Sequence, residues 1–144
     1  IMVQEPARQG IFAYEKIEGV KAIFRQFLGE MDKDGEYFVL AGRPLNVKLE
    51  GFLLDFQKKR SRKGVKTKMV HSKANFEYAK FREKLKHTKV RYVTENFPAS
   101  INIYKDYVAI VAAAQEPMGV LIKSEEIAAS FRDYFKIIWK NARA

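Results

Sequence analysis

The sequence predicts an α/β domain with a mostly parallel sheet, helices on both faces of that sheet and an antiparallel hairpin late in the chain. Three observations support this fold class. Short apolar segments alternate with amphipathic segments of helical period, and the connections between them are short. Two later apolar segments flank a two-residue polar turn, which is typical of a hairpin. The length of 144 residues, 47% of them apolar, suits one domain with a buried core.

The first half of the chain is expected to begin with two strand-helix units. Residues 10–14 are a strand candidate, and apolar residues that recur every three or four positions predict a helix over residues 16–33. Residues 36–42 are mostly apolar, as in strands that are buried on both faces of a parallel sheet. The next amphipathic helix begins near Leu49, and Gly64 is placed to cap its carboxyl end.

Two more strands and a polar helix are predicted in the middle of the chain. The strands cover residues 65–71 and 89–93, and the helix between them runs from about residue 75 to residue 86. Strands and helices therefore alternate up to residue 93. Because the connections are short, this order favours parallel pairing of successive strands.

The last third of the chain is expected to turn to antiparallel pairing. Lys105-Asp106 forms the polar turn of the hairpin, and a further strand covers residues 119–123. Ser124 is a natural N-cap for the final helix, because its hydroxyl can accept a hydrogen bond from a free backbone N–H. The apolar stripe of this helix comprises Ile127, Phe131, Tyr134, Phe135 and Ile138. We expect the stripe to pack on the sheet, and a surface for a partner protein is the alternative.

The positive charge of the chain is concentrated in one segment. The net charge is +10, and residues 58–91 contain 14 lysines and arginines against two glutamates, whereas the rest of the chain has 13 cations and 15 anions. A concentrated basic segment is the usual electrostatic signature of a nucleic-acid-binding protein. The alternative is a set of solvated cations on helix faces, because no motif that reads a nucleic-acid groove occurs in the segment.

Composition excludes several kinds of site. Without cysteine, the chain has no disulfide, no thiolate nucleophile and no cysteine-based zinc site. The longest apolar run, residues 107–114, is far shorter than the roughly 20 residues of a membrane-spanning helix, so we expect a cytoplasmic protein. Because the chain begins with Ile1, we also expect residues 1–9 to be a linker from a missing N-terminal part and residues 10–144 to be a single domain.

Motifs for cofactor, metal or acid-base chemistry do not occur in the sequence. There is no dinucleotide-binding or phosphate-binding glycine loop and no metal-ligand spacing, so neither a cofactor nor a metal is expected. The adjacent pair Glu125-Glu126 suits the start of a helix, where the helix dipole favours anions. The sequence therefore offers no pair of carboxylates for general acid-base catalysis.

The pair His71 and Lys73 has the H-x-K spacing of the phospholipase D superfamily. In that superfamily the histidine is the nucleophile, the lysine binds phosphate, and an aspartate follows where this chain has Tyr78. Two copies of the motif are needed, and His87 is the only other histidine. We therefore expect the spacing to be a coincidence and the chain to be catalytically inactive.

Four segments carry a resemblance to a known family: YEKIEGVKAIFRQFL into EYFVLAG, FQKKRSRKGVKTKMV, VRYVTENFPASINIYKDYVAIV and GVLIKSEEIAASFRDYFKIIWKNA. Together they resemble the effector portion of the TrmB-like family of archaeal transcriptional regulators, over nearly the whole chain. The most specific part is the ending, in which Ile122-Lys123-Ser124 opens a helix that finishes in Phe135 and Trp139.

The resemblance implies a phospholipase D-like fold and a DNA partner, and we also expect a homodimer. In the family a winged helix-turn-helix that binds DNA precedes the effector portion, and none occurs in this chain. The resemblance also bears on the H-x-K spacing. In phospholipase D-like enzymes the histidine and lysine lie on the first strand of the late hairpin, and no histidine occurs here from Thr88 onward.

A ligand site is expected at the carboxyl ends of the parallel strands, where open α/β sheets bind their ligands. The candidate residues at these ends are Arg43, His71, Lys73, Asn75 and Asn96. Arg43 as a bidentate donor and Lys73 as a point charge would hold a sugar or an anionic metabolite. The alternative is that each of these residues is a solvated loop residue, a helix cap or a strand end.

The sequence thus predicts a ligand-sensing regulatory domain of a transcriptional regulator. A different class of function also fits the charge distribution, namely a basic nucleic-acid-binding module that uses the Lys58–Lys68 run on phosphates. An enzyme is the third hypothesis.

Overall fold

The computed structural model describes residues 9–44, 47–112 and 115–144. Within them, seven strands form one sheet in the order β1-β7-β6-β5-β2-β3-β4. The strands are β1 (Gly10–Glu15), β2 (Glu36–Leu40), β3 (Lys66–Ser72), β4 (Thr88–Val93), β5 (Ala99–Tyr104), β6 (Tyr107–Ala112) and β7 (Met118–Lys123). The helices are α1 (Lys16–Glu30), α2 (Val47–Arg62), α3 (Phe76–Glu83) and α4 (Glu125–Asn141), and a short 3-10 helix, η1, covers Lys73–Asn75.

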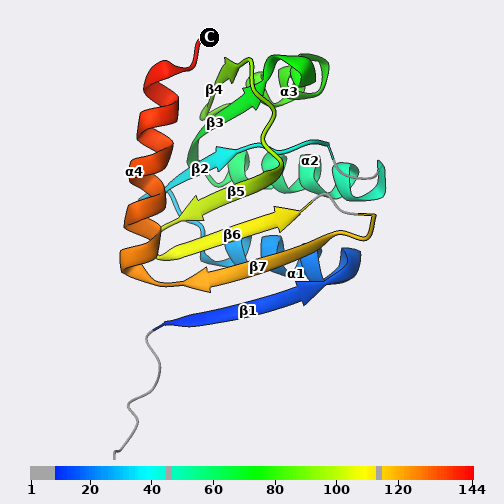
Figure 1. Cartoon of the computed structure of the whole chain (residues 1–144), viewed down its shortest axis with the longest axis vertical. Helices are drawn as coiled ribbons and strands as arrows, with labels where there is room; N and C mark the ends of the chain where they lie inside the picture. Colours follow the sequence, from blue (N-terminus) through cyan, green and yellow to red (C-terminus); the bar gives the residue numbers. More distant parts are fainter. Residues whose placement is uncertain (1–8, 45–46, 113–114) are drawn as a thin grey trace, which may run out of the picture.

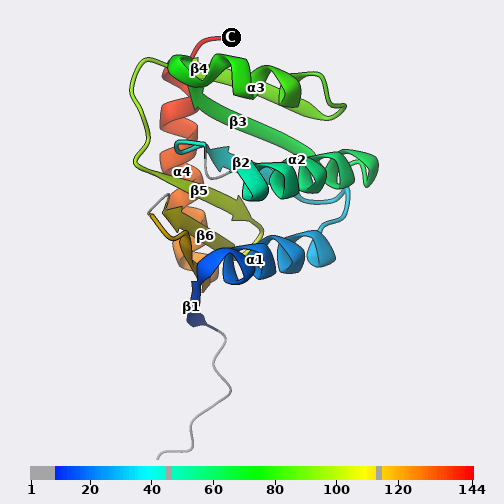
Figure 2. The ribbon, with the colours of Figure 1, turned by 90° about the vertical axis from the view of Figure 1, so that its right-hand side faces the viewer.

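Helices cover both faces of the sheet, as the sequence predicted. Helices α1, α2 and α3 lie on one face and α4 crosses the other (Figures 1 and 2). Each face has its own core, because successive residues of a strand point to opposite sides. Tyr37 packs under α1 and α2 with Phe27 and Phe56, whereas its neighbour Phe38 packs under α4 against Phe135.

The prediction of a mostly parallel sheet is wrong. Of the six strand pairs in the described residues, β2–β3 and β3–β4 are parallel and the other four are antiparallel. The first strand causes part of the error, because β1 does not pair with β2 but lies at the far edge, antiparallel to β7. A short apolar strand fits either kind of pairing, so the local pattern could not settle the direction.

Three local predictions are confirmed. Strands β5 and β6 form an antiparallel hairpin that turns at Lys105, whose φ angle is 51°. Gly64 follows the end of α2 with a φ angle of 76°, a conformation that glycine adopts without a steric penalty. The Ser124 hydroxyl accepts a hydrogen bond from the backbone N–H of Ile127 at 3.2 Å and caps α4.

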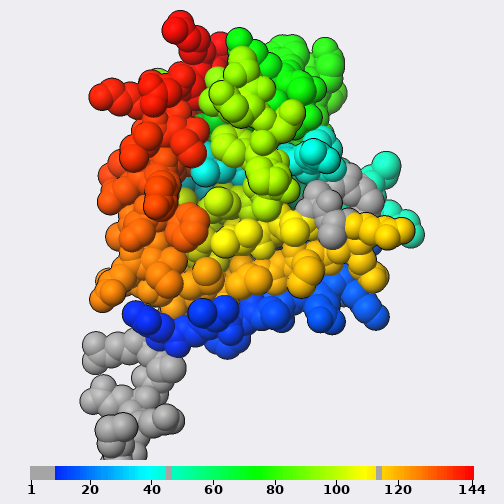
Figure 3. Space-filling view, viewed as in Figure 1, coloured from blue at the N-terminus to red at the C-terminus, as the bar shows by residue number. Residues whose placement is uncertain are grey.

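Helix α4 packs on the sheet through part of its predicted stripe. Phe135 is buried and stacks on Trp139 with 5.8 Å between ring centres, while Phe131 and Ile138 are half-buried against the same core. Tyr134 does not belong to the buried face, since 62% of its surface is exposed. The helix leaves part of its side of the sheet uncovered, and side chains of β5, β6, β7 and β1 reach the surface beside it (Figure 3).

Candidate functional site

A small pocket lies where the carboxyl end of β2 meets β3 and the start of β5, beneath α2 and α3. Its cavity volume is about 60 Å³. Gly42 makes this arrangement possible, because a Cβ atom there would lie 2.8 Å from both the carbonyl carbon of Ala99 and the amide nitrogen of Ser100. A side chain at this position would therefore force β2 and β5 apart and open the pocket wall.

His71 is a buried polar residue of the pocket lining. Its side chain is 2% exposed, and neither ring nitrogen has a hydrogen-bond partner among the described residues. Burial, and secondarily the nearby charge of Arg82, lowers the pKa of His71 to about 3. The imidazole is therefore neutral at physiological pH and offers one hydrogen-bond donor and one acceptor.

A buried ion pair forms the wall on the side of α2 and α3. The guanidinium of Arg82 lies 3.7 Å from a carboxylate oxygen of Glu50, donates a hydrogen bond to the Tyr78 hydroxyl and sits 4.0 Å from the centre of the Tyr78 ring. Burial lowers the pKa of Arg82, and the Glu50 carboxylate opposes that shift. The positive charge of Arg82 is thus already balanced within the wall.

Hydrogen bonds between strands fix the floor of the pocket. The buried hydroxyl of Tyr37 donates to the side-chain oxygen of Asn102 at 2.5 Å, and burial raises the pKa of Tyr37. The Asn102 amide nitrogen lies 3.4 Å from the hydroxyl of Ser100 and from the carbonyl oxygen of Ala109. Since the Ser100 oxygen is the acceptor in the first of these contacts, its hydroxyl proton is available to a ligand.

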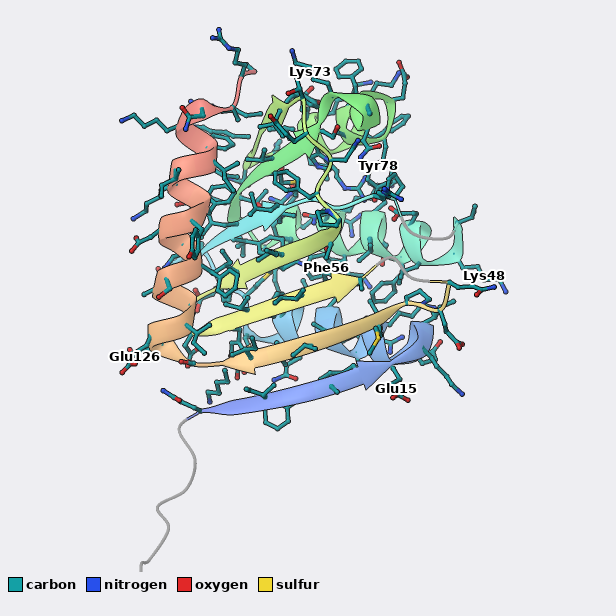
Figure 4. All side chains as sticks on the ribbon, viewed as in Figure 1. Glu15, Lys48, Phe56, Lys73, Tyr78 and Glu126 are labelled. Carbon is teal, nitrogen blue, oxygen red and sulfur yellow. The ribbon has the colours of Figure 1, made fainter. Side chains whose placement is uncertain are left out.

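The five residues predicted from the sequence do not converge on one site. Arg43 and His71 line this pocket, with Arg43 exposed at the rim. Lys73 lines a separate hollow of about 440 Å³ between the end of β4 and the end of α4, whereas Tyr78 lines the first pocket (Figure 4). Asn75 precedes α3 but makes no side-chain capping bond, and Asn96 is an exposed residue that lines none of the described hollows.

The separation of His71 and Lys73 has a local cause. Alternation along a strand would place both side chains on one face. The strand ends at Ser72, whose hydroxyl accepts a hydrogen bond from the Ala74 N–H at 3.2 Å and starts η1. Because the chain turns at this point, Lys73 is exposed while His71 stays buried. The H-x-K spacing therefore does not bring the two side chains into one site.

Sequence reasoning missed most of the polar pocket lining, including Glu50, Gln57 and Arg82. A usable signal existed in α2, where Gln57 is buried beside Phe56 on the apolar face of the helix. A polar residue on an apolar helix face indicates a buried hydrogen-bonding role. The ion pair of Glu50 with Arg82 gave no such signal, because its partners are 32 positions apart in the sequence.

Two kinds of feature are absent from the part of the chain that the structure describes. No group of three or more acidic or histidine side chains there is arranged to hold a metal ion. None of the described helices combines the length and apolar character that crossing a bilayer requires.

Comparisons with known proteins found solved structures with a similar fold. No family model and no curated protein matches the sequence. Among solved structures, the chain is similar to TrmBL2, an archaeal chromatin protein with a novel mode of DNA binding, at 18% identity and a TM-score of 0.66 over 92% of this chain and 53% of TrmBL2. It is also similar to NucT from Helicobacter pylori, at 10% identity and a TM-score of 0.63 over 94% of this chain and 99% of NucT. The chain therefore spans about half of TrmBL2 and shares its fold with both proteins.

Proposed function

We propose that this chain is the ligand-sensing effector part of a TrmB-like transcriptional regulator, and that a small molecule binds in the pocket of His71. The fold shared with TrmBL2 and the sequence resemblance support the family. The observation that carries the ligand site is the buried His71 imidazole, whose two nitrogens have no partner among the described residues. Buried polar groups are almost always hydrogen-bonded, so an imidazole in this state favours a ligand that supplies the missing bonds.

The chemistry of the pocket favours hydroxyl groups over a bare charge. His71 is neutral, Ser100 has a hydroxyl proton to donate, and the charge of Arg82 is balanced by Glu50. Such groups suit the paired donor and acceptor character of a sugar hydroxyl. Arg43 at the rim would contact an anionic substituent outside the cavity. A cavity of about 60 Å³ accepts only one end of a sugar, so the ligand would be partly exposed.

The same pocket favours binding without turnover. A general base works best with a pKa near the operating pH, whereas the pKa of His71 is about 3. No carboxylate among the described residues is hydrogen-bonded to the His71 ring, so nothing there orients it as a catalytic base. We accordingly propose that the chain is not an enzyme and that the ligand acts as an effector.

The regulatory role would depend on parts beyond this chain. We propose that DNA is bound by an N-terminal winged helix, consistent with the chain spanning about half of TrmBL2, and that the protein is a homodimer. Ligand binding would act on the packing of α2 and α3, because the pocket wall is the Glu50–Arg82 pair that joins these helices.

The test is a thermal-shift screen of sugars, sugar phosphates and nucleotides on the chain, repeated on variants. His71→Phe removes both ring hydrogen-bonding groups at similar size, and it should abolish the shift produced by any hit. Lys73→Ala is the matched control, because Lys73 lies in a different hollow, and it should leave the shift unchanged.

Two results would contradict the proposal. Hits that survive His71→Phe would show that the ligand binds elsewhere. Hydrolysis of a phosphodiester that disappears in His71→Ala would show that the chain is an enzyme.

A further inference from the structure

Another hollow lies at the amino ends of β3 and β4, at the opposite end of the parallel strands from the His71 pocket. Its volume is about 490 Å³, and its lining includes Lys66, Lys68, Lys89 and His87. Lys68 and Lys89 are directly opposite each other in the β3–β4 register, on the face of the sheet that carries α4. The strand pairing therefore places two lysines side by side on one face of the sheet.

The lysines of this hollow outnumber the acids in its lining. Glu36 is the acidic residue in the lining, and its carboxylate lies 4.0 Å from the Lys68 ammonium. Two like charges held near each other on neighbouring strands repel, and this repulsion disfavours the sheet. Strand ends that bring three lysines and a single carboxylate into one hollow are therefore suited to an anion from outside the chain.

A buried arginine adds positive charge behind the hollow. Arg60 is fully buried and donates hydrogen bonds to the carbonyl oxygens of Val65 and His87, at 2.9 and 3.2 Å, and to the Thr88 hydroxyl at 2.7 Å. Burial lowers the pKa of Arg60 to about 10, which leaves the guanidinium charged at neutral pH. Within the described residues Arg60 forms no ion pair with a carboxylate, so its charge adds to that of the lysines.

The basic surface continues beyond the hollow toward the end of α4. Arg91 lies two residues after Lys89 on the same face of β4, and its guanidinium sits 4.2 Å from the centre of the Trp139 ring. The Arg91 side chain also donates to the Trp139 carbonyl oxygen at 2.8 Å, and the Lys68 ammonium lies 5.7 Å from the same ring. Lys66, Lys68, Lys89 and Arg91 thus lie along one face of two neighbouring strands over several residue positions, an arrangement that suits an extended polyanion.

We propose that this amino-end surface, formed by Lys66, Lys68, Lys89 and Arg91, binds the phosphate backbone of duplex DNA without reading its base sequence. Lysine and arginine contacts to phosphates supply most of the affinity of sequence-independent binding. A single strand fits less well, because Trp139 is stacked on Phe135 and covered by Arg91 and offers no free ring for a base. This site is separate from the proposed ligand pocket and does not depend on it.

The surface also differs from the Lys58–Lys68 run that the sequence suggested. The fold divides that run: Lys58 and Lys59 are exposed on α2, with Lys59 paired to Asp55 at 3.0 Å, whereas Arg60 is buried. Lys66 and Lys68 lie on the sheet beside the cations of β4. Position in the sheet, and not adjacency in the sequence, assembles the proposed site.

The test measures binding of the whole chain to a short fluorescent duplex of random sequence by anisotropy, as a function of salt. We expect log K to fall linearly with log salt. The double variant Lys68→Gln/Lys89→Gln should reduce the slope by about two, because each phosphate contact contributes about 0.9. The matched control Lys48→Gln/Lys58→Gln removes the same charge from exposed positions outside the hollow and should leave the slope unchanged. Thermal unfolding checks that all variants are folded.

Three results would overturn the proposal. The first is a folded wild-type chain that shows no salt-dependent binding. The second is an equal loss of slope in both double variants, which would indicate diffuse attraction without a defined site. The third is stabilisation of the chain by inorganic phosphate or pyrophosphate with no binding of the duplex, which would assign the hollow to a small anion. The His71→Phe variant should bind the duplex like the wild type. The duplex measurement therefore tests this proposal even if the ligand proposal fails.

Discussion

The two ends of the parallel strands β2, β3 and β4 each contain a buried arginine, but the two arginines have different partners. At the carboxyl end, Arg82 faces the Glu50 carboxylate at 3.7 Å, and the nearby cavity contains the neutral His71. At the amino end, Arg60 has only uncharged hydrogen-bond acceptors, and lysines surround the open hollow in front of it. Where the buried charge is paired, as for Arg82, the nearby site can select a ligand only by shape and hydrogen bonds. Where the buried charge has no anionic partner, as for Arg60, it produces a positive field that attracts anions.

The largest expected effect concerns the helix that supports the amino-end surface. Phe135→Ala should lower the free energy of unfolding by about 3 to 5 kcal/mol, because it leaves a cavity under Trp139 and Phe38. Urea unfolding measures the change. The control Tyr134→Ala, at an exposed position of the same helix, should change it by less than about 0.5 kcal/mol. A small effect of Phe135→Ala would mean that α4 is not held on the sheet.

The next prediction compares substitutions of the two buried arginines, Arg60 and Arg82. Arg60→Met leaves several buried acceptors without a donor, and Arg82→Met leaves a carboxylate without its cation, so each should cost about 2 to 4 kcal/mol in urea unfolding. Their effects on duplex binding should differ, because only Arg60 lies behind the amino-end hollow. We expect weaker binding of the duplex for Arg60→Met and unchanged binding for Arg82→Met. Equal binding by the two folded variants would remove the electrostatic distinction between the two ends.

A third prediction uses pH to test the state of His71. The folded pKa of about 3 lies below the usual value of 6.5, so the unfolded chain binds the proton first as pH falls. His71 should therefore cost no stability above about pH 6.5 and reduce stability progressively down to about pH 3. Between pH 7 and pH 5 its contribution should be a loss of about 2 kcal/mol. The free energy of unfolding of His71→Phe, measured with urea at pH 7 and pH 5, should not show this part of the loss.

The smallest effect is expected at Lys89, which faces Lys68 across β3 and β4. Lys89→Gln relieves the repulsion and keeps the ion pair between Lys68 and Glu36. At low ionic strength the free energy of unfolding should rise by up to about 0.5 kcal/mol, and the gain should vanish at high salt because of screening. A gain that is independent of salt would point to a cause other than charge.

The candidate site was only partly predictable from the sequence. The rule that ligands bind at the carboxyl ends of strands led to Arg43 and His71, which do line the pocket. The same rule included Lys73, Asn75 and Asn96, because it says which end of a strand is used but not toward which face a side chain turns. Ser72 decides that point by starting η1 immediately after the strand.

The sequence by itself determined the local features of this protein. The cap at Ser124, the stop at Gly64 and the hairpin at Lys105 follow from contacts between residues a few positions apart, which the local pattern contains. Only the tertiary structure decided that β1 pairs antiparallel with β7. It also decided the hydrogen bond between Tyr37 and Asn102, which are 65 positions apart. Such contacts depend on the pairing and register of whole strands, and a short apolar strand does not encode which neighbour it will have or in which direction it will pair.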